Sequence, residues 1–177
     1  MGIIPLLLQL LSVEDEQLNL CTVYLIGKLS VNEDTHPDIH ANRTISHLIN
    51  HKYATGHVRT YSIGAIRKLC ENRSTDIECL MVNEIIQFVV ESCAYDNMEC
   101  CRQIVSCICH LALRNEARTE IVMSKMMMDS LFDLCKLTDV EVCRFALGSI
   151  ANIAEDYRLC RAITPPADTV ASLLCLI

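Results

Sequence analysis

Apolar residues recur along this chain with a period of about 42 residues. The segment 2–11, GIIPLLLQLL, has counterparts that begin at Arg43, Glu84, Met126 and Asp168, each 41 or 42 residues after the one before. In this register, apolar positions three and four residues apart line up in columns, as on the buried stripe of one helix. The columns are Ile4, Ile45, Ile86, Met128 and Val170; Leu7, Leu48, Val89, Leu131 and Leu173; and Leu8, Ile49, Val90, Phe132 and Leu174.

A second class of apolar segment alternates with the first and repeats in steps of 40 or 42 residues. Its apolar columns lie at i, i+3 and i+6, and a column of small residues follows at i+7, which again describes a helical stripe. Small side chains at i+7 suit a close approach of neighbouring helices. The columns are Val23, Ile63, Val105 and Leu147; Ile26, Ile66, Ile108 and Ile150; Leu29, Leu69, Leu111 and Ile153; and Ser30, Cys70, Ala112 and Ala154.

Each repeat therefore contains two long helices, and a shorter helical piece is expected before the first of them. We predict these short pieces at 75–81, 117–123 and 157–163, with Pro165 and Pro166 separating the last of them from the next long helix. Polar, mostly acidic loops at 32–34, 95–97, Asp139 and 155–156 separate the units.

Three helices in about 42 residues are typical of armadillo-type repeats. The chain resembles the armadillo family in two segments: FALGSIANIAED at 145–156 is similar to the family's third-helix pattern, and GIIPLL at 2–7 to the opening of its second helix. The resemblance, to importin-alpha-like and beta-catenin-like superhelices, implies an all-α, right-handed alpha-alpha solenoid of about four repeats, incomplete at both ends. Residues 1–177 would form a single array with approximate units 1–12 (partial), 13–53, 54–94, 95–137 and 138–177 (partial).

The same resemblance implies a non-enzymatic scaffold that binds an extended or helical segment of a partner protein along a concave face lined by third helices. Where importin-alpha-like members carry Trp, this chain has Tyr24 and then Gly64, Ser106 and Gly148. Two lysines on the groove instead favour an acidic partner, as in beta-catenin-like members. The candidate contact residues are Tyr24, Lys28, Tyr61, Lys68, Gln103, His110, Phe145 and Asn152.

Two other functions stay open at this point. The array could be a structural spacer within a larger multi-repeat protein, or an importin-alpha-like transport adaptor. A net charge of −7 argues against nucleic-acid binding, which needs basic surface to meet phosphate. The chain has no glycine-rich phosphate loop, G-x-S-x-G elbow or paired-carboxylate motif, so we expect no catalytic residue, no cofactor and no enzymatic activity.

Two clusters of potential metal ligands have a simpler structural interpretation. Cys100, Cys101, Cys107, Cys109 and His110 lie on one predicted helix and point in several directions, which indicates packed or surface cysteines rather than a zinc site. His47 and His51 are four residues apart, but no Glu follows His47 as in the zinc motif H-E-x-x-H. Because His47 shares a column with Leu6 and Phe88, we expect it to be partly buried and structural. We predict no metal site.

The 12 cysteines fall mostly in apolar helical runs, where reduced Cys behaves as a small hydrophobic residue. This indicates a reducing, intracellular location, cytoplasmic and/or nuclear, although the sequons at 42–44 and 72–74 are an opposing signal. No apolar stretch is long enough to cross a membrane.

The two ends of the chain carry incomplete repeats. The sequence opens inside a repeat, and the stripe Val170, Leu173, Leu174 and Ile177 on its last predicted helix has no following helix to cover it. Uncovered apolar stripes associate with other surfaces. We therefore expect either a longer gene product or self-association through the ends.

The cysteine pattern predicts that folding needs no disulfide. Alkylation of the non-reduced, denatured protein should label all 12 thiols, as read by mass spectrometry. Native disulfides in this experiment would overturn the intracellular assignment.

Overall fold

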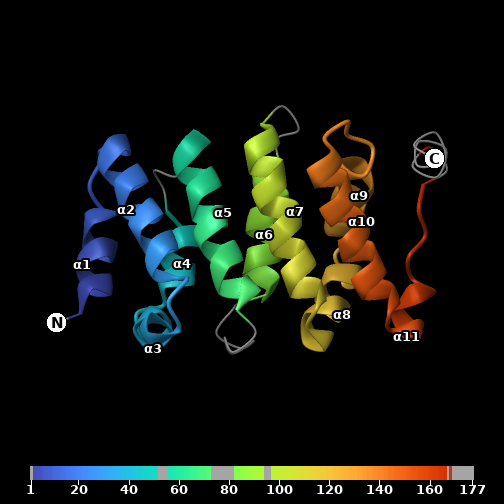
Figure 1. Ribbon diagram of the computed structural model, residues 1–177, viewed down its shortest axis with the longest axis horizontal. Helices are drawn as coiled ribbons and strands as arrows, with labels where there is room; N and C mark the ends of the chain where they lie inside the picture. Colours follow the sequence, from blue (N-terminus) through green and yellow to red (C-terminus); the bar gives the residue numbers. More distant parts are fainter. Residues whose placement is uncertain (1, 52–55, 73–81, 94–96, 167, 169–177) are drawn as a thin grey trace. The chain divides into compact units, whose positions relative to one another are not determined.

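The computed structural model describes residues 2–51, 56–72, 82–93, 97–166 and 168, and within these ranges every regular element is a helix (Figure 1). These helices group into two compact units, Met1–Ile85 and Ile86–Ile177. The division falls inside helix α6 (Val82–Ser92), one of the repeated apolar segments predicted to lie within a single array.

The first unit is dominated by two long helices, α2 and α5, which run side by side. Gly27 of α2 faces Ala65 of α5, where a Cβ added to the glycine would lie 3.6 Å from the alanine Cα. Small residues at this contact let the two helices approach closely. The unit contains α1 (Ile3–Leu10), α2 (Glu16–Leu29), the 3-10 helix η1 (Glu33–Thr35), α3 (His36–Ala41), α4 (Thr44–Ile49), α5 (Gly56–Glu71) and the start of α6.

The second unit repeats this arrangement around α7 and α10, which also run side by side. Helix α9 packs against α8, α10 and α7, so its apolar stripe is covered from three directions. The unit contains the rest of α6 together with α7 (Met98–Ala112), α8 (Asn115–Met123), α9 (Lys125–Leu134), α10 (Val140–Ala154) and α11 (Tyr157–Cys160).

Polar side chains cap the N-termini of three of the long helices. Asp15, Asn97 and Asp139 precede α2, α7 and α10, and each side chain accepts a hydrogen bond from the backbone N–H three residues later, at 2.8, 3.0 and 2.9 Å. Such caps satisfy backbone donors that lack a partner within the helix. The three caps occupy equivalent positions of their repeats, so they fix where each long helix begins.

The short helices tie back to the helix that precedes them. Nε2 of His36, on α3, lies 3.0 Å from the carbonyl oxygen of Ser30, and Nε of Arg118, on α8, donates to the carbonyl of Ala112 at 2.7 Å. Ser30 and Ala112 share the small-residue column at the end of the long helices. Two different side chains thus satisfy equivalent helix-end carbonyls.

The apolar columns are largely confirmed. Ile26, Ile66 and Ile108 are almost completely buried, as are the described members of the columns that begin at Ile4 and Leu7. The prediction for Ile150 is wrong, because this residue is only partly buried. No later long helix of its class lies among the described residues to pack on this face of α10, where Leu147 is also exposed.

Element boundaries differ from the prediction in three places. Helix α8 begins two residues before the predicted segment 117–123, and α11 ends at Cys160 rather than 163. Beyond α11, the N–H groups of Ala162 and Ile163 bond three residues back, so the chain continues as turns. Residues 33–35 form a 3-10 helix, with the Asn32 side chain accepting from the Asp34 N–H at 3.1 Å. The predicted short piece at 75–81 lies outside the described residues, as does the last predicted helix, 168–177, apart from Asp168.

Burial of the second-class columns makes a stability prediction. Replacing Ile108 by Ala should lower the free energy of unfolding by about 2–5 kcal/mol, since Ile108 is 1% exposed and truncation leaves a cavity. The matched control is Ile3→Ala on α1, where the side chain is 49% exposed and the loss should be well below that range. Urea denaturation measures both, and equal losses would contradict the register of the columns.

Candidate functional site

The eight candidate contact residues fall into two sets, one in each unit. Tyr24 and Lys28 lie on α2, with Tyr61 and Lys68 on α5, whereas the second set lies on α7 and α10. The second set is Gln103, His110, Phe145 and Asn152. All eight side chains are at least partly exposed. The first set belongs to the first unit and the second set to the second unit.

In the first unit, two tyrosines and one lysine form a continuous cluster. The ring centres of Tyr24 and Tyr61 lie 5.9 Å apart with planes at 71°, an edge-to-face contact between α2 and α5. Lys28 Nζ lies 5.2 Å from the centre of the Tyr24 ring, within the range of a cation–π interaction. We call these three residues the Tyr24–Lys28–Tyr61 patch. Tyr24 is 50% and Tyr61 43% exposed, so both rings present apolar surface to solvent.

Lys68, the fourth candidate, has a different environment from Lys28. Its Nζ lies 2.8 Å from Glu71 Oε2, and Nη1 of Arg67 lies 3.2 Å from the same oxygen. The carboxylate therefore offsets part of the positive charge at this end of α5. The prediction that two lysines meet an acidic partner therefore treated two different environments as equivalent. Lys28 has no ion pair among the described residues, whereas Lys68 is paired with Glu71.

In the second unit, Gln103 and Asn152 are already hydrogen-bonded within the protein. Gln103 Nε2 donates to Glu99 Oε1 at 2.7 Å, and Asn152 Nδ2 donates to the carbonyl of Cys109 at 3.3 Å. Phe145 lies against the Arg144 guanidinium, whose carbon is 5.1 Å from the ring centre. This surface is consequently less available for polar contacts than the first one.

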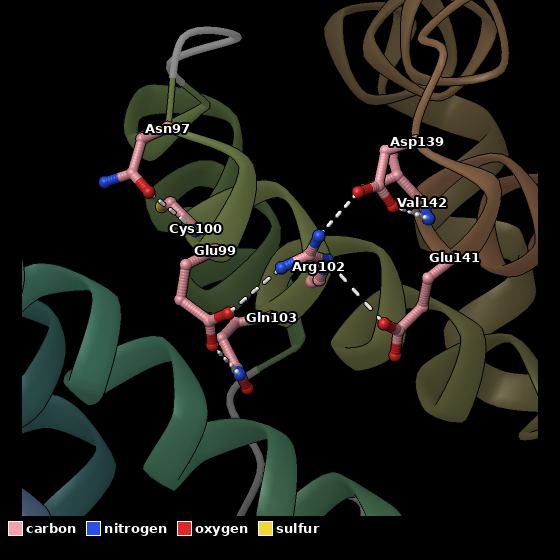
Figure 2. Close-up of polar contacts among 8 residues, drawn as sticks. All are labelled: Asn97, Glu99, Cys100, Arg102, Gln103, Asp139, Glu141 and Val142. Atoms are coloured by element: carbon pink, nitrogen blue, oxygen red, sulfur yellow. Dashed lines mark hydrogen bonds and ion pairs between the residues drawn. The ribbon is translucent and has the colours of Figure 1, made fainter.

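Arg102 forms an ion cluster beside Gln103 that the sequence analysis did not find (Figure 2). Its guanidinium reaches Asp139 at 2.6 Å and both Glu99 and Glu141 at 3.6 Å. The hydrogen bond from Arg102 and the Coulombic attraction of Asp139 raise the pKa of Arg102. The pKa of Asp139 is lowered, first by the hydrogen bond from the Val142 N–H and then by Arg102. Asp139 is thus both helix cap and ion partner, and it joins α7 to the start of α10.

The histidine prediction is wrong for His47, which is exposed. Its column is not uniformly buried, since Leu6 is 49% exposed and Phe88 only 3%. His47 and His51 both line a cavity of about 400 Å³. Burial lowers the pKa of His51, which favours its neutral form. The other lining residues are Leu8, Leu11, Ser12, Ser46 and Asn50.

The cysteines of α7 do not converge on one point. Cys100, Cys101 and Cys107 are buried, whereas Cys109 and His110 are partly exposed. Burial raises the pKa of Cys109, partly opposed by hydrogen bonds to Ser149 and Asn152. Among the described residues, no three His, Cys, Asp or Glu side chains are grouped so as to hold a metal ion.

Comparison with solved structures identifies the fold. An engineered protein superposes with a TM-score of 0.81 at 16% identity, covering 97% of this chain and 71% of its own. A designed armadillo repeat protein gives 0.81 at 18% identity, covering 90% and 68%, and another, solved in complex with the peptide (KR)4, gives 0.75 at 19%, covering 94% and 67%. The chain has an armadillo-like repeat fold. No protein-family profile and no curated protein matches its sequence.

The armadillo-like fold gives each helix class its place. Helices α2, α5, α7 and α10 are third helices, α1, α4, α6 and α9 are second helices, and α3, α8 and α11 are first helices. All eight candidate contact residues therefore lie on third helices of an all-α solenoid. In the part of the chain that the structure describes, no helix combines the length and apolar character needed to cross a bilayer.

The Arg102 cluster makes a pH prediction. Because the pKa of Asp139 is lower in the folded protein, its charge stabilises the fold above the usual carboxyl pKa of about 4, and this contribution is lost as the pH falls through the lowered value. Asp139→Asn keeps a capping side chain, like Asn97, but removes the charge. It should unfold more easily than the parent at pH 7, with the difference shrinking below about pH 4. Urea denaturation of the parent and the variant, at pH 7 and below about pH 4, measures this difference in the free energy of unfolding. A difference that is the same under both conditions would contradict the lowered pKa of Asp139.

Proposed function

We propose that this chain is a non-enzymatic scaffold that binds a segment of a partner protein along its third-helix surface. The observation that carries the proposal is the Tyr24–Lys28–Tyr61 patch. Tyr24 and Tyr61 are 50% and 43% exposed, and aromatic side chains are enriched at protein interfaces relative to the rest of the surface. Tyr is also among the residues that most often carry the binding energy of an interface.

The structural neighbours support the same function by analogy. The designed armadillo repeat protein solved with (KR)4 binds a peptide, which supports a peptide-like segment as the ligand class for this scaffold. Its peptide is basic, whereas the lysines on the third helices of this chain favour an acidic segment. We accordingly propose a partner segment that is acidic at Lys28 and Lys68, with the intracellular location expected from the cysteines.

A spacer within a larger protein is the competing function, and it predicts that third-helix side chains are dispensable. The discriminating observation is dependence of binding on these side chains. Exposed residues on first helices, such as Glu120 of α8, serve as a control because neither the scaffold nor the spacer function needs a partner contact there.

The proposal predicts partner capture that depends on the third helices. Proteins retained from a cell lysate by the immobilised chain should be lost with the double variant Lys28→Glu and Lys68→Glu, and added salt should weaken the parent complex. The control Glu120→Lys should leave capture unchanged. If the double variant captures the same proteins as the parent and the control, the third-helix surface is not the binding site and the spacer function is favoured.

A further inference from the structure

We infer that the Tyr24–Lys28–Tyr61 patch recognises a partner segment through one aromatic or aliphatic side chain and one carboxylate, spaced two residues apart. The inference rests on the proposed partner-binding function and names the chemistry that this surface selects.

The apolar half of the recognition comes from the tyrosine pair. Its edge-to-face contact at 5.9 Å holds the Tyr61 and Tyr24 rings in place across two helices. Rings fixed in this way lose little conformational freedom on binding, so they form a preorganised apolar surface. Because Tyr24 and Tyr61 are 50% and 43% exposed, an apolar side chain of the partner can cover the pair.

The polar half comes from Lys28. Its Nζ is held beside the Tyr24 ring by a cation–π contact and has no carboxylate partner among the described residues. Lys68 and Arg67, in contrast, share Glu71. The patch therefore offers one uncompensated positive charge, which fits a single carboxylate and disfavours a basic side chain. The patch itself contains no second cation, so a long acidic run would gain no further charge contact from it.

The distance between the two halves sets the spacing of the motif. Lys28 Nζ lies 5.2 Å from the Tyr24 ring centre. An extended chain advances ~3.3 Å per residue, and side chains two residues apart point to the same side. An apolar side chain and an Asp or Glu at i and i+2 therefore match the patch, in either order along the chain.

The experiment is a selection of peptides from a randomised eight-residue phage-display library on the complete chain. Enriched peptides should contain an aromatic or large aliphatic residue two positions from an Asp or Glu. The best peptide, made synthetically with a fluorescent label, is then titrated against variants. Lys28→Met should weaken binding roughly fivefold and remove most of its salt dependence. Lys125→Met, at an exposed lysine of the second helix α9, is the matched control and should change binding less than twofold.

Variants of the rings test the apolar half. Tyr24→Phe keeps the ring contact and should bind like the parent, whereas Tyr24→Ala should weaken binding. Thermal denaturation checks that each variant is folded. Because Tyr24 and Lys28 are exposed, we expect their substitution to leave the fold intact. Peptides that bind third helices but ignore Lys28→Met and Tyr24→Ala would refute this recognition chemistry and leave the scaffold function standing. A selection that enriches no peptide at all would refute both.

Discussion

The packing of one third helix against the next is the contact on which the rest of this structure depends. A single repeat cannot bury its own apolar stripe, so α2 requires α5, and α7 requires α10. Small residues at the contact, such as Gly27 against Ala65, set the distance at which the long helices meet. The candidate binding residues lie on these same helices. Their spacing on the surface is therefore a product of core packing, as the Tyr24–Tyr61 contact across α2 and α5 illustrates.

Periodicity predicted the helix classes and most of the core, because a buried stripe constrains residue type at every repeat. The burial of Ile26, Ile66 and Ile108, and of the described members of the Leu7 column, therefore followed from the sequence. Ile150, the last member of the Ile26 column, was mispredicted because its burial also depends on which helix of the next repeat packs on it, and residue type in a column does not specify that. His47 failed for a related reason: its column lies at the edge of the stripe, where Phe88 is covered and Leu6 is not.

For the candidate site, the sequence predicted which helices and positions carry exposed side chains but not which of them are already engaged. Hydrogen bonds such as that from Asn152 to the carbonyl of Cys109 join residues more than 40 positions apart, so no local sequence pattern predicts them. The pairing of Lys68 with Glu71 is local and could have been recognised from the three-residue spacing. Arg102 joins Asp139 across 37 residues, and the only sequence signal was the capping residue at the start of α10.

The bonds from His36 and Arg118 to the carbonyls of Ser30 and Ala112 determine where this chain can be divided into exchangeable repeats. Each donor and its acceptor lie in the same unit of the column register, 13–53 for the first bond and 95–137 for the second. A module exchanged at these unit boundaries therefore keeps both the carbonyl at the end of its long helix and the side chain that bonds to it. A cut between a third helix and the first helix after it would separate the two, so the segments of this chain that can be exchanged intact begin at the long helix.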